Sequence, residues 1–94
     1  MAPREDPRSS YQRGYTKRWA RTSKAFLARY PCCGMRPECA PPVMSQCYDE
    51  DRLTPATLTD HVRPHHGDPL LFWDAGNYQA MCSTCHQRKT RAGL

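Results

Sequence analysis

The stretch "MCSTCHQRKTR", residues 81–91, contains two cysteines three positions apart and a histidine directly after the second. This Cys-x2-Cys spacing is typical of half a tetrahedral zinc site, because a tight turn can aim two thiolates at one ion about 2.3 Å away. The histidine either joins Cys82 and Cys85 on that ion or serves a second site. On a helix His86 is rotated by about 100° from Cys85, so if four cysteines hold the zinc its ring points to a different face.

The remaining cysteines leave the second half of the zinc site open. They are Cys32, Cys33, Cys39 and Cys47, and no Cys-x2-Cys pair occurs among them. Adjacent cysteines are poor partners for one ion, because the side chains of neighbouring residues diverge. The sequence therefore predicts a structural zinc held by Cys82, Cys85 and two of these four.

Size and composition favour the metal over disulfides. A chain of 94 residues with nine prolines has a small core, and such chains usually need disulfides or a metal to fold stably. Residues 1–10 contain no apolar signal segment, and no run is apolar enough to span a membrane. We therefore expect a cytoplasmic protein whose cysteines bind metal, with a secreted disulfide-bonded protein as the weaker alternative.

Charge is distributed unevenly along the chain. Residues 1–31 carry a net charge of +6, residues 32–81 of −4 and residues 82–94 of +3. Two basic ends around an acidic middle suit a polyanion held at its phosphates over a metal-binding centre. An unevenly charged, solvated surface explains the same pattern.

The first half of the chain is expected to form a helix and a loop. Residues 1–10 look like a flexible basic arm, rich in proline, arginine and serine. Apolar residues recur at steps of three and four across residues 11–30, which predicts an amphipathic helix ended by Pro31. Residues 31–51 hold four cysteines and many prolines, and are expected to be loop.

The second half, residues 52–94, is expected to form a β-hairpin followed by a helix. Strands are predicted at Thr57–Val62 and Asn77–Met81, joined by a long connection in which Asp68 caps a short helical turn. Ser83 is expected to cap a last helix over residues 84–90. The predicted fold is a small, zinc-stabilised α+β domain.

A second cluster of polar residues falls at the ends of the two predicted strands. Asp60 and His61 end the first strand, and Asn77 begins the second. An antiparallel hairpin can bring these ends together, and the helix that carries His86 lies across it. Asp60 and His86, from two elements, would form an oxygen and nitrogen site for a divalent cation. A neutral His61 beside a metal-bound phosphate is well placed to take a proton from water.

These residues carry a resemblance to a known family. The string "TDHVRPHHGD…LFWDAGNYQAMCSTCHQRKT" resembles the HNH endonucleases, whose fold is the ββα-metal motif, and especially the small stand-alone kind found in phages and prophages. The three signature positions would be His61, Asn77 and His86. The match is close over residues 52–90 and extends upstream through "LARYPCC".

The resemblance implies a ligand set for the zinc. Relatives commonly carry four cysteines, and Cys82 and Cys85 match the later pair. By their places after Tyr30-Pro31 and before "RLTPATLTDH", Cys33 and Cys47 match the earlier pair, although thirteen residues separate them instead of two. An insertion explains this departure, because the cost of closing a loop grows slowly with its length. Cys39 and, less so, Cys32 stay as rival ligands.

The resemblance also implies metal-dependent hydrolysis of DNA in a bacterial or phage-infected cell. Asp60 and His86 would hold one Mg²⁺, Mn²⁺ or Ni²⁺ ion, His61 would be the general base, and Asn77 would orient the hairpin and His61. Four basic residues would contact the DNA backbone: Arg63, Arg88, Lys89 and Arg91. Phage packaging machinery is a further expected partner. The oligomeric state, the target sequence and the choice between nicking and double-strand cleavage stay open. A non-catalytic, zinc-dependent nucleic-acid-binding module is the main alternative.

Overall fold

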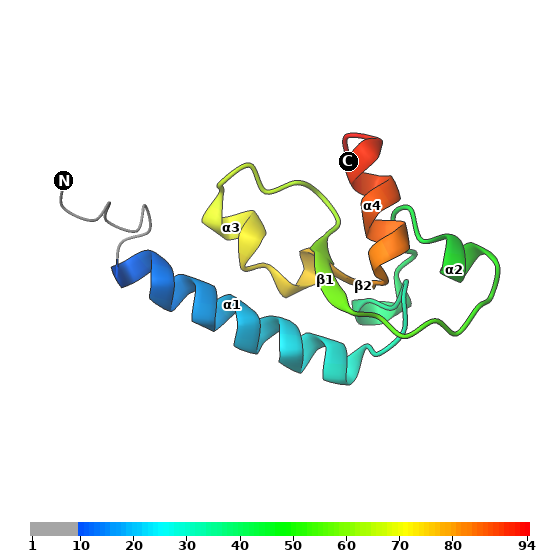
Figure 1. The fold of residues 1–94 in the computed structure, drawn as a ribbon, viewed down its shortest axis with the longest axis horizontal. Helices are drawn as coiled ribbons and strands as arrows, with labels where there is room; N and C mark the ends of the chain where they lie inside the picture. The colour runs from blue at the N-terminus through cyan, green and yellow to red at the C-terminus, as the bar shows by residue number, and fades with distance from the viewer. Residues whose placement is uncertain (1–9) are drawn as a thin grey trace, which may run out of the picture.

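The computed structural model describes residues 10–94 and has the expected α+β fold (Figure 1). A long helix, α1 (Ser10–Arg29), runs beneath an antiparallel hairpin of β1 (Leu58–His61) and β2 (Tyr78–Met81). The last helix, α4 (Ser83–Arg91), follows β2 directly. The predicted arm lies outside the described residues except for Ser10, which opens α1.

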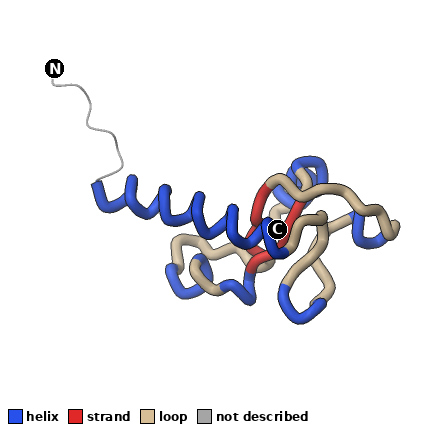
Figure 2. Tube along the Cα trace, turned by 90° about the horizontal axis from the view of Figure 1, so that it is seen from below, coloured by secondary structure: helices blue, strands red, loops and turns tan. Residues whose placement is uncertain are grey.

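Helix α1 packs its apolar stripe on one face of the hairpin. Phe26 is buried against Tyr78 and Ala80 of β2, and Trp19 and Tyr30 pack around this group. The Oγ atom of Ser23 donates a hydrogen bond to Thr59 Oγ1 of β1 at 2.8 Å. Pro31 follows the end of the helix, and it has no backbone N–H with which to continue the helical hydrogen bonds. Figure 2 shows α1 crossing the two strands.

The register of the hairpin separates its side chains into two sets. Asp60 pairs with Gln79, and His61 pairs with Tyr78. Because neighbouring residues on a strand point to opposite faces, His61 lies with Tyr78 on the face covered by α1. Asp60 and Gln79 lie on the other face, toward α4 and the cysteine loop.

The cysteine loop, residues 31–51, is more regular than the sequence predicts. It contains a short 3-10 helix, η1 (Pro37–Cys39), and one helical turn, α2 (Gln46–Asp49). The Oγ atom of Ser45 accepts a hydrogen bond from the backbone N–H of Tyr48 and so caps α2. Gly34 has a φ of +95°, and a Cβ there would lie 2.7 Å from the Cβ of Tyr48, so only glycine fits.

The connection between the strands contains two more short elements. These are α3 (Pro69–Phe72) and the 3-10 turn η2 (Ala75–Asn77). Asp68 caps α3 as expected, since its Oδ1 accepts from Leu70 N at 2.9 Å. The second strand begins one residue later than predicted, because Asn77 belongs to η2.

The start of α4 differs from the prediction. Cys82 is the residue that precedes the helix, and Ser83 is its first helical residue. The side chain of Cys82 makes no capping hydrogen bond, which leaves its sulfur free for another role. Within residues 10–94, no helix combines the length and hydropathy needed to cross a bilayer.

Candidate active site

Four cysteines from three segments converge behind the hairpin. Cys33 follows α1, Cys47 lies in α2, and Cys82 and Cys85 flank the start of α4. All four are buried, and their sulfur atoms lie within 4.8 Å of one another. The sulfur of Cys47 is 3.9 Å from those of Cys82 and Cys85. Thiolates about 2.3 Å from one tetrahedral zinc are about 3.8 Å apart, so the cluster is compatible with a zinc site.

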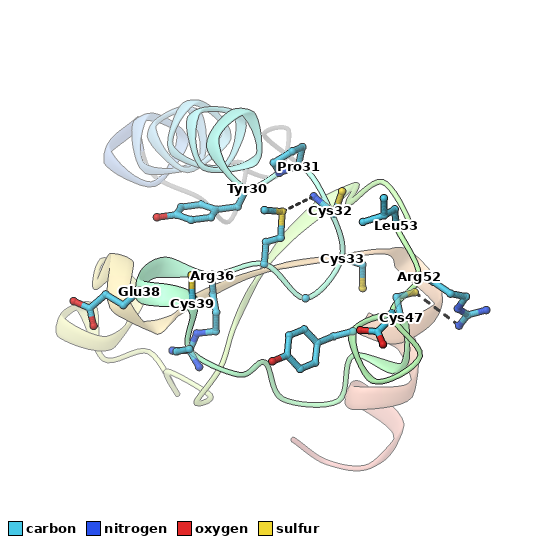
Figure 3. A pocket seen from close by; sticks show the side chains of 15 residues that line it. Tyr30, Pro31, Cys32, Cys33, Arg36, Glu38, Cys39, Cys47, Arg52 and Leu53 are labelled. Atoms are coloured by element: carbon cyan, nitrogen blue, oxygen red, sulfur yellow. Dashed lines mark hydrogen bonds between the residues drawn. The ribbon is translucent and has the colours of Figure 1, made fainter.

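The rival cysteines do not join this cluster. Cys39 is exposed and Cys32 is partly exposed. Both line a cavity of about 520 Å³ between the end of α1 and the cysteine loop. Figure 3 shows Cys33 and Cys47 near each other at one side of the cavity, whereas Cys39 lies on the opposite side. None of Asp60, His61 and His86 lines this cavity, so it is separate from the second cluster.

The environment of the cluster has opposite effects on two of its thiols. Burial raises the pKa of Cys33 to about 12, although Ser45 Oγ lies 3.2 Å from its sulfur. Burial also opposes ionisation of Cys85, but hydrogen bonds from the backbone of Cys47 and the thiol of Cys82 outweigh it and lower the pKa of Cys85 to about 7. A cation among the four sulfurs would favour the thiolate form of each.

His86 lies on a different side of α4 from Cys85. Cys85 is buried in the cysteine cluster, whereas the half-exposed His86 turns its Nε2 to within 3.4 Å of Asp60 Oδ1. This is the rotation expected of neighbours on a helix. Two atoms about 2.1 Å from one ion are about 3.0–3.4 Å apart in octahedral or tetrahedral geometry, so the pair fits a shared divalent cation.

The second oxygen of Asp60 is already occupied. Asp60 Oδ2 accepts a hydrogen bond from Gln79 Nε2 at 2.8 Å and lies 3.2 Å from Lys89 Nζ. Lys89 is only 2% exposed, and its ammonium also donates to the carbonyl oxygens of His61 and Leu94. The expected role of Lys89 in binding DNA phosphates is therefore corrected: its ammonium faces Asp60 inside the fold. The other three basic residues expected there are exposed: Arg63, Arg88 and Arg91.

His61 is held by an aromatic pocket on the opposite face. Its ring stacks on Trp19, with centroids 5.1 Å apart and planes at 19°, and lies 4.7 Å from the ring of Phe72. His61 Nε2 is 2.9 Å from the carbonyl oxygen of Phe72. Because a carbonyl only accepts, Nε2 carries the hydrogen and the lone pair of a neutral ring lies on Nδ1. Burial lowers the pKa of His61 below 6.5, although the Phe72 carbonyl opposes this shift.

Asn77 closes the connection between the strands. Its Oδ1 accepts from Arg63 N at 2.9 Å, and its Nδ2 donates to the carbonyls of Arg63 and Leu71. Its own carbonyl accepts from Val62 N. The buried amide therefore fixes the chain on both sides of the segment that carries Phe72, the hydrogen-bond partner of His61.

Two residues of the site were not singled out from the sequence as part of it. Trp19 follows the helical stripe of α1, which predicts packing but not a histidine partner. Gln79 is a polar residue at an inward-facing strand position, and it is completely buried. Such a residue signals a buried hydrogen-bond network, but nothing in its spacing names Asp60 as the acceptor.

Comparison with solved structures identifies the class of fold. The chain is similar to the crystal structure of an HNH endonuclease with manganese ion from the deep-sea thermophilic bacteriophage GVE2. The two chains are 29% identical, with a TM-score of 0.57, over 88% of this chain and 87% of that one. No family model and no curated protein sequence matches the chain. The resemblance to HNH endonucleases is thus confirmed by the fold: a helix, an antiparallel hairpin and a second helix around a four-cysteine cluster.

Proposed function

We propose that the chain is an endonuclease that hydrolyses the phosphodiester bonds of DNA with the help of a divalent metal ion. The observation that carries the proposal is the pair Asp60 Oδ1 and His86 Nε2, 3.4 Å apart beside the end of β1, where His61 lies. A solved structure with a similar fold is that of an HNH endonuclease with manganese ion.

His61 is the general base in this proposal. Its Nε2–H is committed to Phe72, so Nδ1 is the position that accepts a proton from the attacking water. The lowered pKa keeps the ring neutral, and therefore basic, at physiological pH. Asn77 holds the segment that supplies the Phe72 carbonyl, which keeps the ring in one orientation.

Asp60 and His86 would hold the cation, one through an oxygen and the other through a nitrogen. Bound there, a Mg²⁺, Mn²⁺ or Ni²⁺ ion supplies Lewis acidity at the phosphate and stabilises charge on the 3′ leaving oxygen. The four cysteines Cys33, Cys47, Cys82 and Cys85 would hold a structural zinc that ties α4 to the loop. The exposed Arg63, Arg88 and Arg91 would contact phosphates next to the cleaved bond.

Cleavage of supercoiled plasmid tests the proposal. Wild type should nick or linearise the plasmid with Mg²⁺, Mn²⁺ or Ni²⁺ and not with EDTA, and His61→Ala should lose this activity while keeping one zinc per chain. His66→Ala is the matched control, because His66 is an exposed histidine of the same connection. If wild type binds DNA and zinc but does not cleave DNA with any of the three ions, the chain is instead a zinc-dependent binding module.

A further inference from the structure

The side chain of Gln79 connects the cysteine loop to the carboxylate of Asp60. Gln79 is 0% exposed, and every hydrogen-bonding position of its amide nitrogen is used. Its Nε2 donates to Asp60 Oδ2 at 2.8 Å and to the carbonyl of Val43 at 3.1 Å. Its Oε1 accepts from the backbone N–H of Val43 at 2.8 Å.

The backbone of Val43 fixes which way the amide faces. Turning the amide over would set Gln79 Oε1 against two acceptors, Asp60 and the Val43 carbonyl, and Nε2 against the Val43 N–H. Each of those contacts is repulsive in a buried site, where an unmade hydrogen bond costs about 1–3 kcal/mol. The loop that carries Val43 therefore determines that a donor, and not an acceptor, faces Asp60.

That loop is itself anchored at several points. Cys33 near its start and Cys47 near its end belong to the cysteine cluster. Gly34 N donates to Ala80 O at 2.7 Å, and Ala80 N donates to Met35 O at 2.9 Å, so the loop also pairs with the outer edge of β2. Gln79 precedes Ala80 on the same strand. The position of Val43 is thus set by the cysteine cluster and by β2 together.

We propose that Gln79 is a positioning residue for the metal ligand Asp60. With Lys89, it satisfies Asp60 Oδ2 and leaves Oδ1 alone to face His86, so that Asp60 offers one oxygen to the cation in a fixed direction. The inference rests on the proposed function, because it takes Asp60 and His86 as the ligands of a divalent ion.

The test compares Gln79→Met with wild type by Mn²⁺ titration in the absence of DNA and by plasmid cleavage. Methionine has a similar length and no donor, so Asp60 Oδ2 loses this hydrogen bond and keeps its contact with Lys89. Loss of such a partner of a metal ligand typically costs 10–100-fold in affinity or activity. We expect Mn²⁺ affinity and kcat each to decrease by about 10–100-fold. The KM for DNA should change by less than about twofold. Gln87→Met, an exposed glutamine on α4, is the matched control and should bind Mn²⁺ like wild type.

A double-mutant cycle separates positioning from a general loss of packing. If Gln79 acts through Asp60, Gln79→Met should lower the residual cleavage of Asp60→Asn by far less than it lowers that of wild type. Equal effects in both backgrounds would overturn the inference. Should Gln79→Met fail to retain zinc, Gln79→Leu takes its place, because it also lacks the donor to Asp60 and adds no charge to the buried site. Its kcat should fall in the same range.

The outcomes distinguish this inference from the proposed function. If wild type binds Mn²⁺ without cutting DNA, the nuclease proposal fails and the titration alone decides the role of Gln79. A folded Gln79→Met protein with wild-type Mn²⁺ affinity and kcat would overturn the inference and leave the nuclease intact. Equal Mn²⁺ binding by wild type and His86→Ala would show that the ion lies elsewhere. Both the inference about Gln79 and the proposed function would then be wrong.

Discussion

The indole of Trp19 stacks on the imidazole of His61, with ring centroids 5.1 Å apart and the two planes at 19°. Trp19 belongs to α1, outside the hairpin and helix that carry the resemblance to HNH endonucleases. The proposed general base is therefore held partly by an element that lies before the motif in the chain. Phe72 and Tyr78 complete the aromatic surroundings of the ring.

Removing this stack should impair cleavage more than DNA binding. Trp19→Leu loses an aromatic contact worth about 0.5–1.5 kcal/mol and leaves the His61 ring less tightly held, by Phe72 and Tyr78. We expect kcat to fall by roughly tenfold, since a misplaced base reacts poorly, while KM changes little. Trp19→Phe should keep most of the activity, because it retains a flat ring. Steady-state kinetics on a labelled duplex would measure both constants, and equal losses in the two variants would contradict this role.

The pH dependence of cleavage should reflect the burial of His61. Because burial lowers its pKa, the ring stays neutral below 6.5, and the acidic limb of the rate profile should have its midpoint below that value. A bound cation shifts the midpoint further in the same direction. Trp19→Ala exposes the ring and should move the limb back up toward 6.5. An acidic limb with its midpoint above pH 6.5 in wild type would argue against His61 as the base.

The same shift affects stability with a definite sign. Below 6.5 the unfolded chain takes up a proton at His61 more readily than the folded chain does, so this group lowers the free energy of unfolding as the pH falls. Urea unfolding of wild type and His61→Ala between pH 5 and 7 should show the wild type losing more stability on acidification. Parallel curves would show that the ring titrates alike in both states.

Loss of the side-chain amide nitrogen of Asn77 should lower the stability of the fold. Asn77→Asp keeps the acceptor for Arg63 N but removes both donors, which leaves a carboxylate against the carbonyls of Arg63 and Leu71. Each buried group left unpaired costs about 1–3 kcal/mol, so the free energy of unfolding should fall by at least that amount. The reverse exchange at an exposed cap, Asp68→Asn, keeps its acceptor for Leu70 N and should change stability by less than about 0.5 kcal/mol.

Local patterns were sufficient to predict α1, the two strands and α4, and the opposed directions of Cys85 and His86. The period of apolar residues predicts α1, and a rotation of about 100° between neighbours predicts that the two ligands separate. The fold class and the order of strands and helices followed from such rules. These features depend on residues within a few positions of one another.

What the sequence left open depends on contacts between distant residues. The choice of Cys33 and Cys47 over Cys32 and Cys39 requires the path of a loop that turns at Gly34 and packs against Ser45 and Tyr48. Lys89 was expected to face DNA, but the short α4 brings its ammonium to Asp60 and to the carbonyl of Leu94. Such partners lie up to 29 positions apart along the chain, beyond any periodic pattern.

The four clustered cysteines should be distinguishable from the other two by metal content. Cys47→Ser should reduce bound zinc from one per chain to near zero and lower the unfolding midpoint sharply, because metal binding contributes directly to folding in sites of this kind. Cys39→Ser, at an exposed cysteine of the same loop, should keep the bound zinc and the unfolding midpoint of wild type. Elemental analysis with thermal unfolding measures the two quantities. Loss of zinc in Cys39→Ser would reassign the ligands.

The exposed arginines of the proposed DNA surface should be identifiable by the salt dependence of binding. Each phosphate contact contributes about −0.9 to the slope of log affinity against log salt for duplex DNA. Arg63→Ala, Arg88→Ala and Arg91→Ala should each make the slope shallower by up to this amount, measured by fluorescence anisotropy in a His61→Ala background with EDTA. Lys89→Met should leave the slope unchanged, because its ammonium is buried against Asp60 and meets no phosphate. A shallower slope for Lys89→Met in a folded protein would restore this residue to the DNA surface.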